Sequence, residues 1–311
     1  MQRQAATPKG LERRVRDAHF EEVNDPRVVE KVDYPMQRML SAFVVGIATG
    51  ARTLRKVEER TGQVVKKHQR YMGIDQRIAD NTFGKVMPRL EVGDMVACLQ
   101  QMVKAEYRRR NLKPTALPQG TVAIDGKNVA TLHWHDLCRV LKLKKTEAQP
   151  EEVRALLADR YPELQFCVPE HGKPYALARV HTVTSISSDA AVCIHQRSTL
   201  GHTNEIGSMP ELLDELHTSY GRTTLISMVT TDAGNSSLKV AGLILRHGWD
   251  YFLQIKSGHG ELYAEAKRAL GTKTAEQAEE TTVDQRNGKV VTYRLWQHDL
   301  TDQGWLDWRH A

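Results

Sequence analysis

The sequence predicts an α/β protein in which a mixed β-sheet flanked by helices follows an all-helical N-terminal domain. Up to residue 113, segments rich in Arg, Glu, Val and Ala show few strand-like alternations. After residue 120, β-branched runs alternate with amphipathic segments. A length of 311 residues agrees with about two domains. We therefore expect a helical domain over residues 1–113 and an α/β core over 114–311.

The N-terminal part is expected to contain several helices. Asp25-Pro26 and Tyr34-Pro35 are interpreted as helix entry points, because proline fits the first turn of a helix. Residues 111–120 contain two prolines and a glycine, which is typical of a linker. The expected helices cover residues 12–20, 28–70, a short segment from 83, and 94–110.

Beyond the linker, strands and helices are expected to alternate. The expected strands cover residues 121–125, 175–185, 190–196, 225–231, 249–256 and 289–297. The expected helices cover residues 209–216, 236–246 and 261–270. Residues 133–173 form a polar insertion with a helix-like segment at its centre. An antiparallel group of strands followed by helix-linked strands predicts one mixed sheet.

Two of the expected strands lead into an acid that is followed by a small residue. Asp125 precedes Gly126, and Asp232 precedes Ala233. Because the carboxyl ends of neighbouring strands meet at one edge of a sheet, we expect the two carboxylates to converge. Adjacent carboxylates are costly unless a cation neutralises them, and oxygen ligands favour Mg²⁺ or Mn²⁺. The alternative interpretation is that each aspartate caps a turn.

The positive charge is concentrated in one stretch of the chain. Residues 104–145 carry ten basic and three acidic residues, a net charge of +7, whereas the whole chain carries +6. Clustered cations release counterions from phosphates, so DNA is the expected partner, and a solvated basic face is the alternative. The candidate nucleic-acid-binding residues are Lys104, Arg108, Arg109, Arg110, Lys113, Lys127, Lys142, Lys144, Lys145 and, after a later strand, Lys256.

Other classes of protein and site are less favoured by the sequence. No apolar run reaches the ~20 residues that a bilayer requires, and the N-terminus does not resemble a secretory signal. Four cysteines without a CxxC pair indicate a reducing, cytoplasmic location. A zinc site is an alternative use of several His and Cys residues, whose spacing is wide. These residues are His133, His135, Cys138, Cys167 and His171.

Several motifs resemble one known family. Ile124-Asp125-Gly126-Lys127 resembles the motif that opens the catalytic domain of the H-repeat-associated insertion-sequence transposases, a branch of the DDE superfamily with an RNase H-like core. Further similar segments occur in the family's order over residues 25–297. They are Asp25-Pro26-Arg27, Tyr34-Pro35, Asp80-Asn81-Thr82-Phe83, Thr203-Asn204-Glu205-Ile206, Pro210-Glu211-Leu212-Leu213, Thr231-Asp232-Ala233, and Asp250-Tyr251 with Lys256.

The resemblance implies an RNase H-like fold and a role for Asp125 and Asp232 as shared ligands of Mg²⁺ or Mn²⁺, with no organic cofactor. The family's third acid is a glutamate on a C-terminal helix, and the sequence ends before such a segment. We therefore expect a truncated or domesticated transposase derivative that binds DNA. The chain also departs from the family after Lys256, where Ser257-Gly258 replaces a Gly-Asn turn.

Two alternatives to this function remain open. The protein is an active DNA nuclease or transposase if Glu205, or an acid from a second chain in a homodimer, completes the site. Glu261 and Glu265 are further candidates for the third acid. The second alternative is a non-catalytic scaffold or interaction protein that retains the fold.

Overall fold

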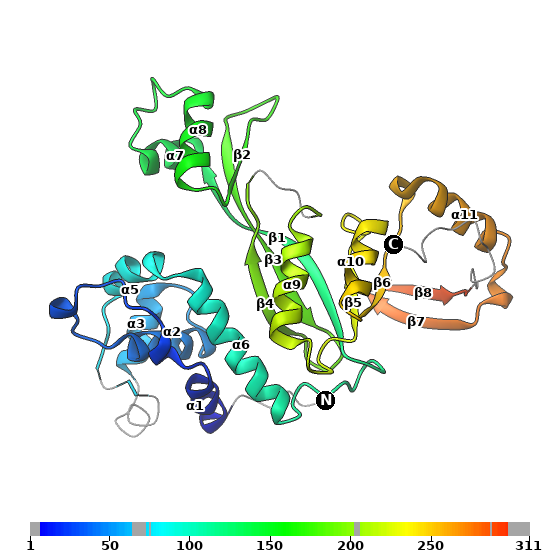
Figure 1. Cartoon of the computed structure of the whole chain (residues 1–311), viewed down its shortest axis with the longest axis horizontal. Helices are drawn as coiled ribbons and strands as arrows, with labels where there is room; N and C mark the ends of the chain where they lie inside the picture. The colour runs from blue at the N-terminus through cyan, green and yellow to red at the C-terminus, as the bar shows by residue number, and fades with distance from the viewer. Residues whose placement is uncertain (1–6, 64–72, 75, 202–205, 287, 298–311) are drawn as a thin grey trace. The chain divides into compact units, whose positions relative to one another are not determined.

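The computed structural model describes residues 7–63, 73–74, 76–201, 206–286 and 288–297 (Figure 1). By the distribution of contacts the chain divides into two compact units. The first unit holds the residues up to Pro118 together with Val183–Gln196. The second unit holds Gln119–Thr182 and the residues from Arg197 onward.

Helices are the regular elements described before residue 113. The α-helices are α1 (Pro8–Asp17), α2 (Met36–Ala48), α3 (Leu54–Gly62), α5 (Asp80–Val86) and α6 (Val92–Arg108). Short 3₁₀ helices cover Phe20–Glu22, Val29–Lys31 and Met87–Arg89. The first unit also includes the adjoining ends of two strands, β3 (Tyr175–Ser185) and β4 (Val192–Ser198), so it is not composed of helices alone.

The stretch 28–70, which the sequence predicts to be helical, contains two separate α-helices, α2 and α3, among its described residues. Pro35 precedes α2, in agreement with the expected entry point. Gly50 adopts a φ of 92°, a left-handed conformation that ends the helical path. The hydroxyl of Thr53 then accepts a hydrogen bond from the Lys56 backbone and starts α3. The last residues of this stretch, 64–70, lie outside the described residues.

The helices α1, α2, α3, α5 and α6 bury one apolar cluster. Its most enclosed members include Met39 and Phe83, both with no exposed surface, and Ile74. Asp25-Pro26 does not start an α-helix. Instead, the carboxylate of Asp25 accepts hydrogen bonds from the backbone and side chain of Arg27, which also donates to the Tyr34 carbonyl at 2.7 Å. These bonds close the turn that leads into α2.

The main sheet is mixed, as the sequence predicts. It contains β1 (Thr121–His133), β2 (Leu164–Cys167), β3, β4, β5 (Met228–Thr231) and β6 (Asp250–Leu253). The order is β2-β3-β1-β5-β6, and β4 also pairs with β3. The strand pairs β1–β5 and β5–β6 are parallel, whereas β2 and β3 are antiparallel.

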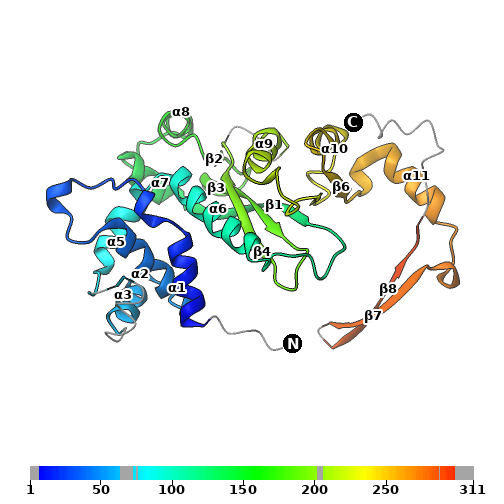
Figure 2. The same ribbon diagram turned by 60° about the horizontal axis from the view of Figure 1, so that its bottom comes forward.

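Two helices cover one face of this sheet. They are α9 (Met209–Tyr220) and α10 (Leu238–Arg246), and Figures 1 and 2 show them side by side over the strands. Leu212, Leu213 and Leu216 of α9 are fully buried, as are Val240 and Ile244 of α10. The apolar stripe of each helix therefore packs onto the sheet. This packing explains why apolar residues recur with helical periodicity in these two segments.

The segment between β1 and β3 folds as a separate small cluster at one end of β1 (Figure 1). It comprises α7 (Trp134–Leu141), α8 (Pro150–Arg160) and β2. Leu137, Val153 and Leu157 have at most 1% of their surface exposed. The predicted polar insertion thus has a core of its own.

The last strands lie outside the main sheet. After α11 (Gly260–Leu270), β7 (Glu280–Arg286) and β8 (Lys289–Leu295) pair antiparallel in a two-stranded sheet of their own. The expectation that residues 289–297 extend the mixed sheet is therefore wrong. Val283, Val290 and Leu295 of this hairpin are exposed. A hairpin pairs locally, so β8 forms its hydrogen bonds without reaching the main sheet.

Candidate functional site

The two aspartates singled out in the sequence follow an in-register pair of residues on neighbouring parallel strands. The ladder between β1 and β5 runs from Thr121 opposite Met228 to Ile124 opposite Thr231. Asp125 is the next residue of β1, and Asp232 is the first residue after β5. The register therefore places the backbones of these two acids at neighbouring positions, at the end of the β1–β5 ladder.

The sequence predicts that the strand ends at Asp125, and this prediction is wrong. Instead, β1 continues to His133, and only its pairing with β5 ends at Ile124. The strand is longer because β1 also pairs with β3. Asp125 therefore lies in the interior of a continuous strand, which holds its backbone more firmly than a turn would.

A close backbone approach sets the register of the two strands. The carbonyl of Gly120 accepts hydrogen bonds from the backbone of Ser227 at 2.7 Å and Met228 at 2.9 Å. A Cβ at Gly120 would lie 2.4 Å from the carbonyl oxygen of Thr224. Only glycine fits this position without a shift of backbone, so Gly120 fixes where β1 begins beside β5.

A tight turn orients the carboxylate of Asp232. Its Oδ1 accepts hydrogen bonds from the backbone and the side-chain nitrogen of Asn235, both at 3.1 Å. The hydroxyl of Ser236 donates to the Asp232 carbonyl at 2.9 Å. The turn-capping role considered from the sequence is therefore present. It engages Oδ1, and the same bonds fix the direction of the whole carboxylate.

Asp125 presents its carboxylate to solvent. The side chain is 56% exposed, and the ammonium of Lys127 lies 3.7 Å from Oδ2. An ion pair this exposed contributes ~0–1 kcal/mol. The pairing with Lys127 therefore does not prevent another cation from reaching Asp125.

The donor set at this edge fits a hard divalent cation. Carboxylate oxygens are preferred ligands of Mg²⁺, which commonly binds one or two carboxylates and retains several waters. Within the part of the chain that the structure describes, no group of three or more His, Cys, Asp or Glu side chains is arranged to hold a metal. Asp125 and Asp232 are the candidate ligands among the described residues, and Glu205, the third acid expected from the sequence, lies outside them.

The zinc alternative is not supported by the arrangement of its residues. His133, His135, Cys138, Cys167 and His171 are all described, and they form no metal-binding group. Cys138 is 1% exposed and packs among the apolar side chains of α7 and α8. Burial raises the pKa of its thiol, which disfavours the thiolate that zinc requires.

The predicted nucleic-acid-binding residues fall into separate parts of the fold. Lys104 and Arg108–Lys113 belong to the first unit, and the later residues belong to the second. Lys142, Lys144 and Lys145 are exposed at the end of α7, where Lys144 pairs with Glu147 at 3.3 Å. The stretch 104–145 is therefore not one structural segment.

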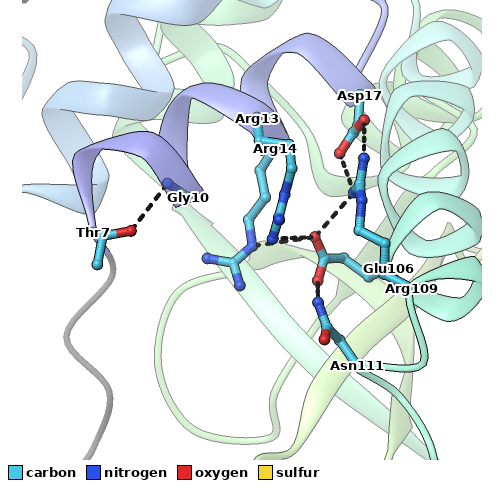
Figure 3. A network of polar contacts seen from close by, with 8 residues as sticks. All are labelled: Thr7, Gly10, Arg13, Arg14, Asp17, Glu106, Arg109 and Asn111. Atoms are coloured by element: carbon cyan, nitrogen blue, oxygen red, sulfur yellow. Dashed lines mark hydrogen bonds and ion pairs between the residues drawn. The ribbon is translucent and has the colours of Figure 1, made fainter.

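Arg109 is engaged inside the first unit rather than projecting alone into solvent. Its guanidinium donates two hydrogen bonds to the carboxylate of Asp17, one of them at 2.8 Å, and a further one to Glu106 (Figure 3). The bonds from Arg109 lower the pKa of Asp17, and Asp17 raises the pKa of Arg109. Arg109 thus connects α1 to α6.

The sequence analysis missed His259, which links two loops of the second unit. The backbone N–H of Lys256 donates to Nδ1 of His259 at 3.0 Å, so Nε2 carries the proton and donates to the carbonyl of Ser236, also at 3.0 Å. Ser236 follows Asp232 in the same turn, and Lys256 is exposed. His259 therefore ties the segment that carries Lys256 to the turn that carries Asp232. No pattern in the sequence indicates this long-range bond.

The comparisons with known proteins give no assignment. No protein-family profile matches the sequence, and neither a curated protein nor a solved structure shows significant similarity to it. Of the helices in the described ranges, none combines the length and the apolar character needed to cross a membrane.

Proposed function

We propose that the protein is a DNA-binding protein of the transposase class, with an RNase H-like core in which Asp125 and Asp232 bind Mg²⁺ or Mn²⁺. The observation that carries the proposal is the parallel register of β1 and β5, which ends with Ile124 opposite Thr231 and one aspartate after each. A pair of strand-edge carboxylates is stable when a cation neutralises it.

The order of the strands supports the RNase H-like core. β1, β3 and β4 adjoin one another through β3, and the parallel strands β5 and β6 continue from β1. The helix α9 precedes β5 and α10 precedes β6, so each parallel strand is reached through a helix. This order agrees with the sheet that the motif resemblance implies.

The chain's own residues supply positioning for a phosphodiester. Asn235 holds the Asp232 carboxylate, and His259 holds the segment of Lys256 against the same turn. An exposed lysine at a sheet edge is suited to contact a phosphate. A divalent ion held by the aspartates would supply Lewis-acid activation for phosphoryl transfer.

Strand cleavage by this site is a second candidate function, favoured by the same pair of aspartates. Phosphoryl transfer at two metal ions usually requires more carboxylates than two. Glu205 or an acid from a second chain would complete such a site. Without it, we expect DNA binding with weak or no cleavage.

Incubation with supercoiled plasmid DNA and Mn²⁺ tests the proposal. The proteins to compare are the wild type, Asp125→Ala, Asp232→Ala and the control Asp250→Ala, which changes an exposed acid at the opposite end of β6. Strand cleavage is supported if the wild type and the control nick the plasmid and either site variant does not. Salt-dependent binding without nicking supports the DNA-binding derivative. Failure to bind DNA at about 50 mM salt, where phosphate contacts are strong, would overturn the proposal.

A further inference from the structure

Two short segments of the first unit together carry as much net charge as the whole chain. Residues 8–17 and 104–113 contain nine basic and three acidic residues, a net charge of +6, and the net charge of all 311 residues is also +6. The first segment is α1 and the second contains the C-terminal end of α6. We call this surface the α1–α6 basic face. Its basic residues are Lys9, Arg13, Arg14, Arg16, Lys104, Arg108, Arg109, Arg110 and Lys113.

Direct contacts join the two segments into one surface. Arg109 at the end of α6 binds Asp17 at the end of α1. Glu106 of α6 lies 3.8 Å from the guanidinium of Arg13 and 3.7 Å from that of Arg14, both on α1 (Figure 3). The cations of the two helices therefore belong to one face, although about ninety positions separate them in the sequence.

The acids of this face are covered, whereas the cations reach solvent. The side chains of Glu106 and Asp17 are 12% and 16% exposed. Arg13 and Arg14 are 45% exposed and Arg16 is 73% exposed. A molecule that approaches the face thus meets mainly guanidinium groups. The same face holds an open hollow of about 660 Å³, which is lined by four cations, Lys9, Arg13, Arg16 and Arg109, and by two acids, Glu12 and Asp17.

One carboxylate, that of Glu106, lies near three arginines of this face before any partner binds. Oε2 of Glu106 accepts a hydrogen bond from the side chain of Asn111 at 2.6 Å. Oε1 forms ion pairs with Arg13, Arg14 and Arg109. A carboxylate fixed by an amide in this way limits the conformations of the arginines around it. Ordering them in advance lowers the entropy lost when a ligand binds.

We propose that the α1–α6 basic face binds the sugar-phosphate backbone of duplex DNA. This inference rests on the proposed function and moves the main DNA contact away from the lysines at the end of α7. Guanidinium groups match phosphate oxygens in a bidentate geometry, and each neutralised phosphate releases counterions. Arg13, Arg14 and Arg16 contact phosphates, and Arg109 acts as a positioning residue that keeps α1 on α6.

A nucleic acid fits this face better than an anionic membrane. Helices that bind membranes combine cations with an apolar face that enters the lipid. In α1 the apolar side chains face the protein instead. Val15 is 9% exposed, and Leu11 packs against the apolar cluster of the helical unit. The larger apolar side chains of α1, Leu11 and Val15, are therefore engaged inside the helical unit.

The test compares two triple variants that remove the same charge. One is Arg13→Gln/Arg14→Gln/Arg16→Gln, and the matched control is Lys142→Gln/Lys144→Gln/Lys145→Gln. Binding of a fluorescein-labelled duplex is measured by anisotropy over a series of salt concentrations. We expect the arginine variant to bind about tenfold more weakly and to reduce the slope of log K against log salt by about 2–3, since each phosphate contact contributes about 0.9. The lysine variant should change the slope by less than about 1.

Several results would overturn this inference and leave the proposed function intact. One such result is that the arginine variant binds the duplex with the affinity of the wild type. Another is that the wild type binds DNA and the two triple variants lose equal amounts of affinity. Tighter binding of the wild type to phosphatidylserine vesicles than to DNA would also contradict it. If wild type binds no DNA at all, the proposed function itself fails. The single variant Arg16→Gln keeps the test valid if the triple variant unfolds. Its side chain is exposed and lies 3.8 Å from the neighbouring Glu12, and the variant should lower the slope by about 1.

Discussion

Ile124 of β1 lies opposite Thr231 of β5 in a parallel ladder, and an aspartate follows each of these two residues in the sequence. Ile124 is 1% exposed and Thr231 is 5% exposed, so a buried pair holds the two strands together immediately before the acids emerge at the surface. The backbone positions of the two aspartates are therefore set by the packing and hydrogen bonds of the sheet. The turn that follows Asp232 then orients its carboxylate.

Replacement of Gly120 should disturb this register. In Gly120→Ala, the new Cβ would meet two backbone carbonyl oxygens, at 2.4 Å from Thr224 and 2.6 Å from Leu225. Because backbone atoms cannot move aside locally, we expect a loss of about 2–3 kcal/mol in the free energy of unfolding, measured by urea denaturation. The control Gly93→Ala places its Cβ in open space within α6 and should gain about 0.5–1 kcal/mol. Equal stability of the two variants would contradict the role given to Gly120.

Removal of the Asp17 charge should destabilise the protein in a pH-dependent way. Folding lowers the pKa of Asp17, first through hydrogen bonds from Arg109, so this carboxylate stabilises the fold above its ordinary pKa of 3.8. We expect Asp17→Asn to lower the free energy of unfolding by about 1–2 kcal/mol at pH 7. As the pH falls below 3.8 toward the lowered pKa of the folded protein, the wild type loses this contribution and the difference between the two proteins shrinks. A difference that stays constant from pH 7 to pH 3 would contradict this explanation.

His247 should make stability fall as the solution becomes acidic. Burial and the nearby His217 ring, 4.9 Å away between centroids, lower the pKa of His247 below 6.5, and the hydrogen bond with Asp214 opposes part of this shift. The unfolded chain therefore binds the proton more readily than the folded chain does, and stability present above pH 6.5 is lost as the pH decreases.

Thermal melts at several pH values test the prediction for His247. Stability should decline less steeply between pH 7 and pH 5 in His247→Gln than in wild type. The control His135→Gln, whose side chain is 67% exposed, should keep the wild-type slope. The ring of Trp249 lies 5.3 Å from that of His247, so its fluorescence offers a second measurement of the same protonation. Identical pH profiles for His247→Gln and wild type would contradict the prediction.

Lys142 occupies a backbone conformation that favours glycine. Its φ of 58° is left-handed, and it ends α7 with a hydrogen bond from the Leu143 backbone to the Cys138 carbonyl at 2.8 Å. Lys142→Gly should raise the free energy of unfolding by about 1 kcal/mol. Lys145→Gly, at an exposed position without positive φ, should not. A stability gain in both variants, or in neither, would show that the backbone of Lys142 is not strained.

The strands of the main sheet were largely predictable because their burial imposes a recognisable pattern. β3 matches the expected range 175–185, since apolar and β-branched residues occur along most of its length. β1 is longer than expected because its later half, after Gly126, contains polar residues that pair with β3 without being buried. Pairing partners of this kind are tertiary contacts, which local composition does not encode.

The sequence contains a turn signal from which the hairpin of β7 and β8 could have been predicted. The sequence Asn287-Gly288 between two β-branched segments is a strong indicator of a two-residue hairpin turn, and Gly288 adopts a φ of 74°. By contrast, no local pattern could predict that Gly120 approaches Thr224 or that His259 binds the Ser236 carbonyl. The candidate aspartates were found from the sequence, and the contacts that orient them required the fold.

The most direct test of the paired-carboxylate site is the binding of Mn²⁺ to the full chain without DNA, measured from the loss of the free-ion signal in electron paramagnetic resonance. Wild type should bind about one ion, and Asp125→Asn and Asp232→Asn should each weaken binding by about tenfold or more. The control Asp250→Asn, at the opposite end of the parallel strands, should bind as wild type does. Binding that persists unchanged in both Asp125→Asn and Asp232→Asn would contradict a cation site between β1 and β5.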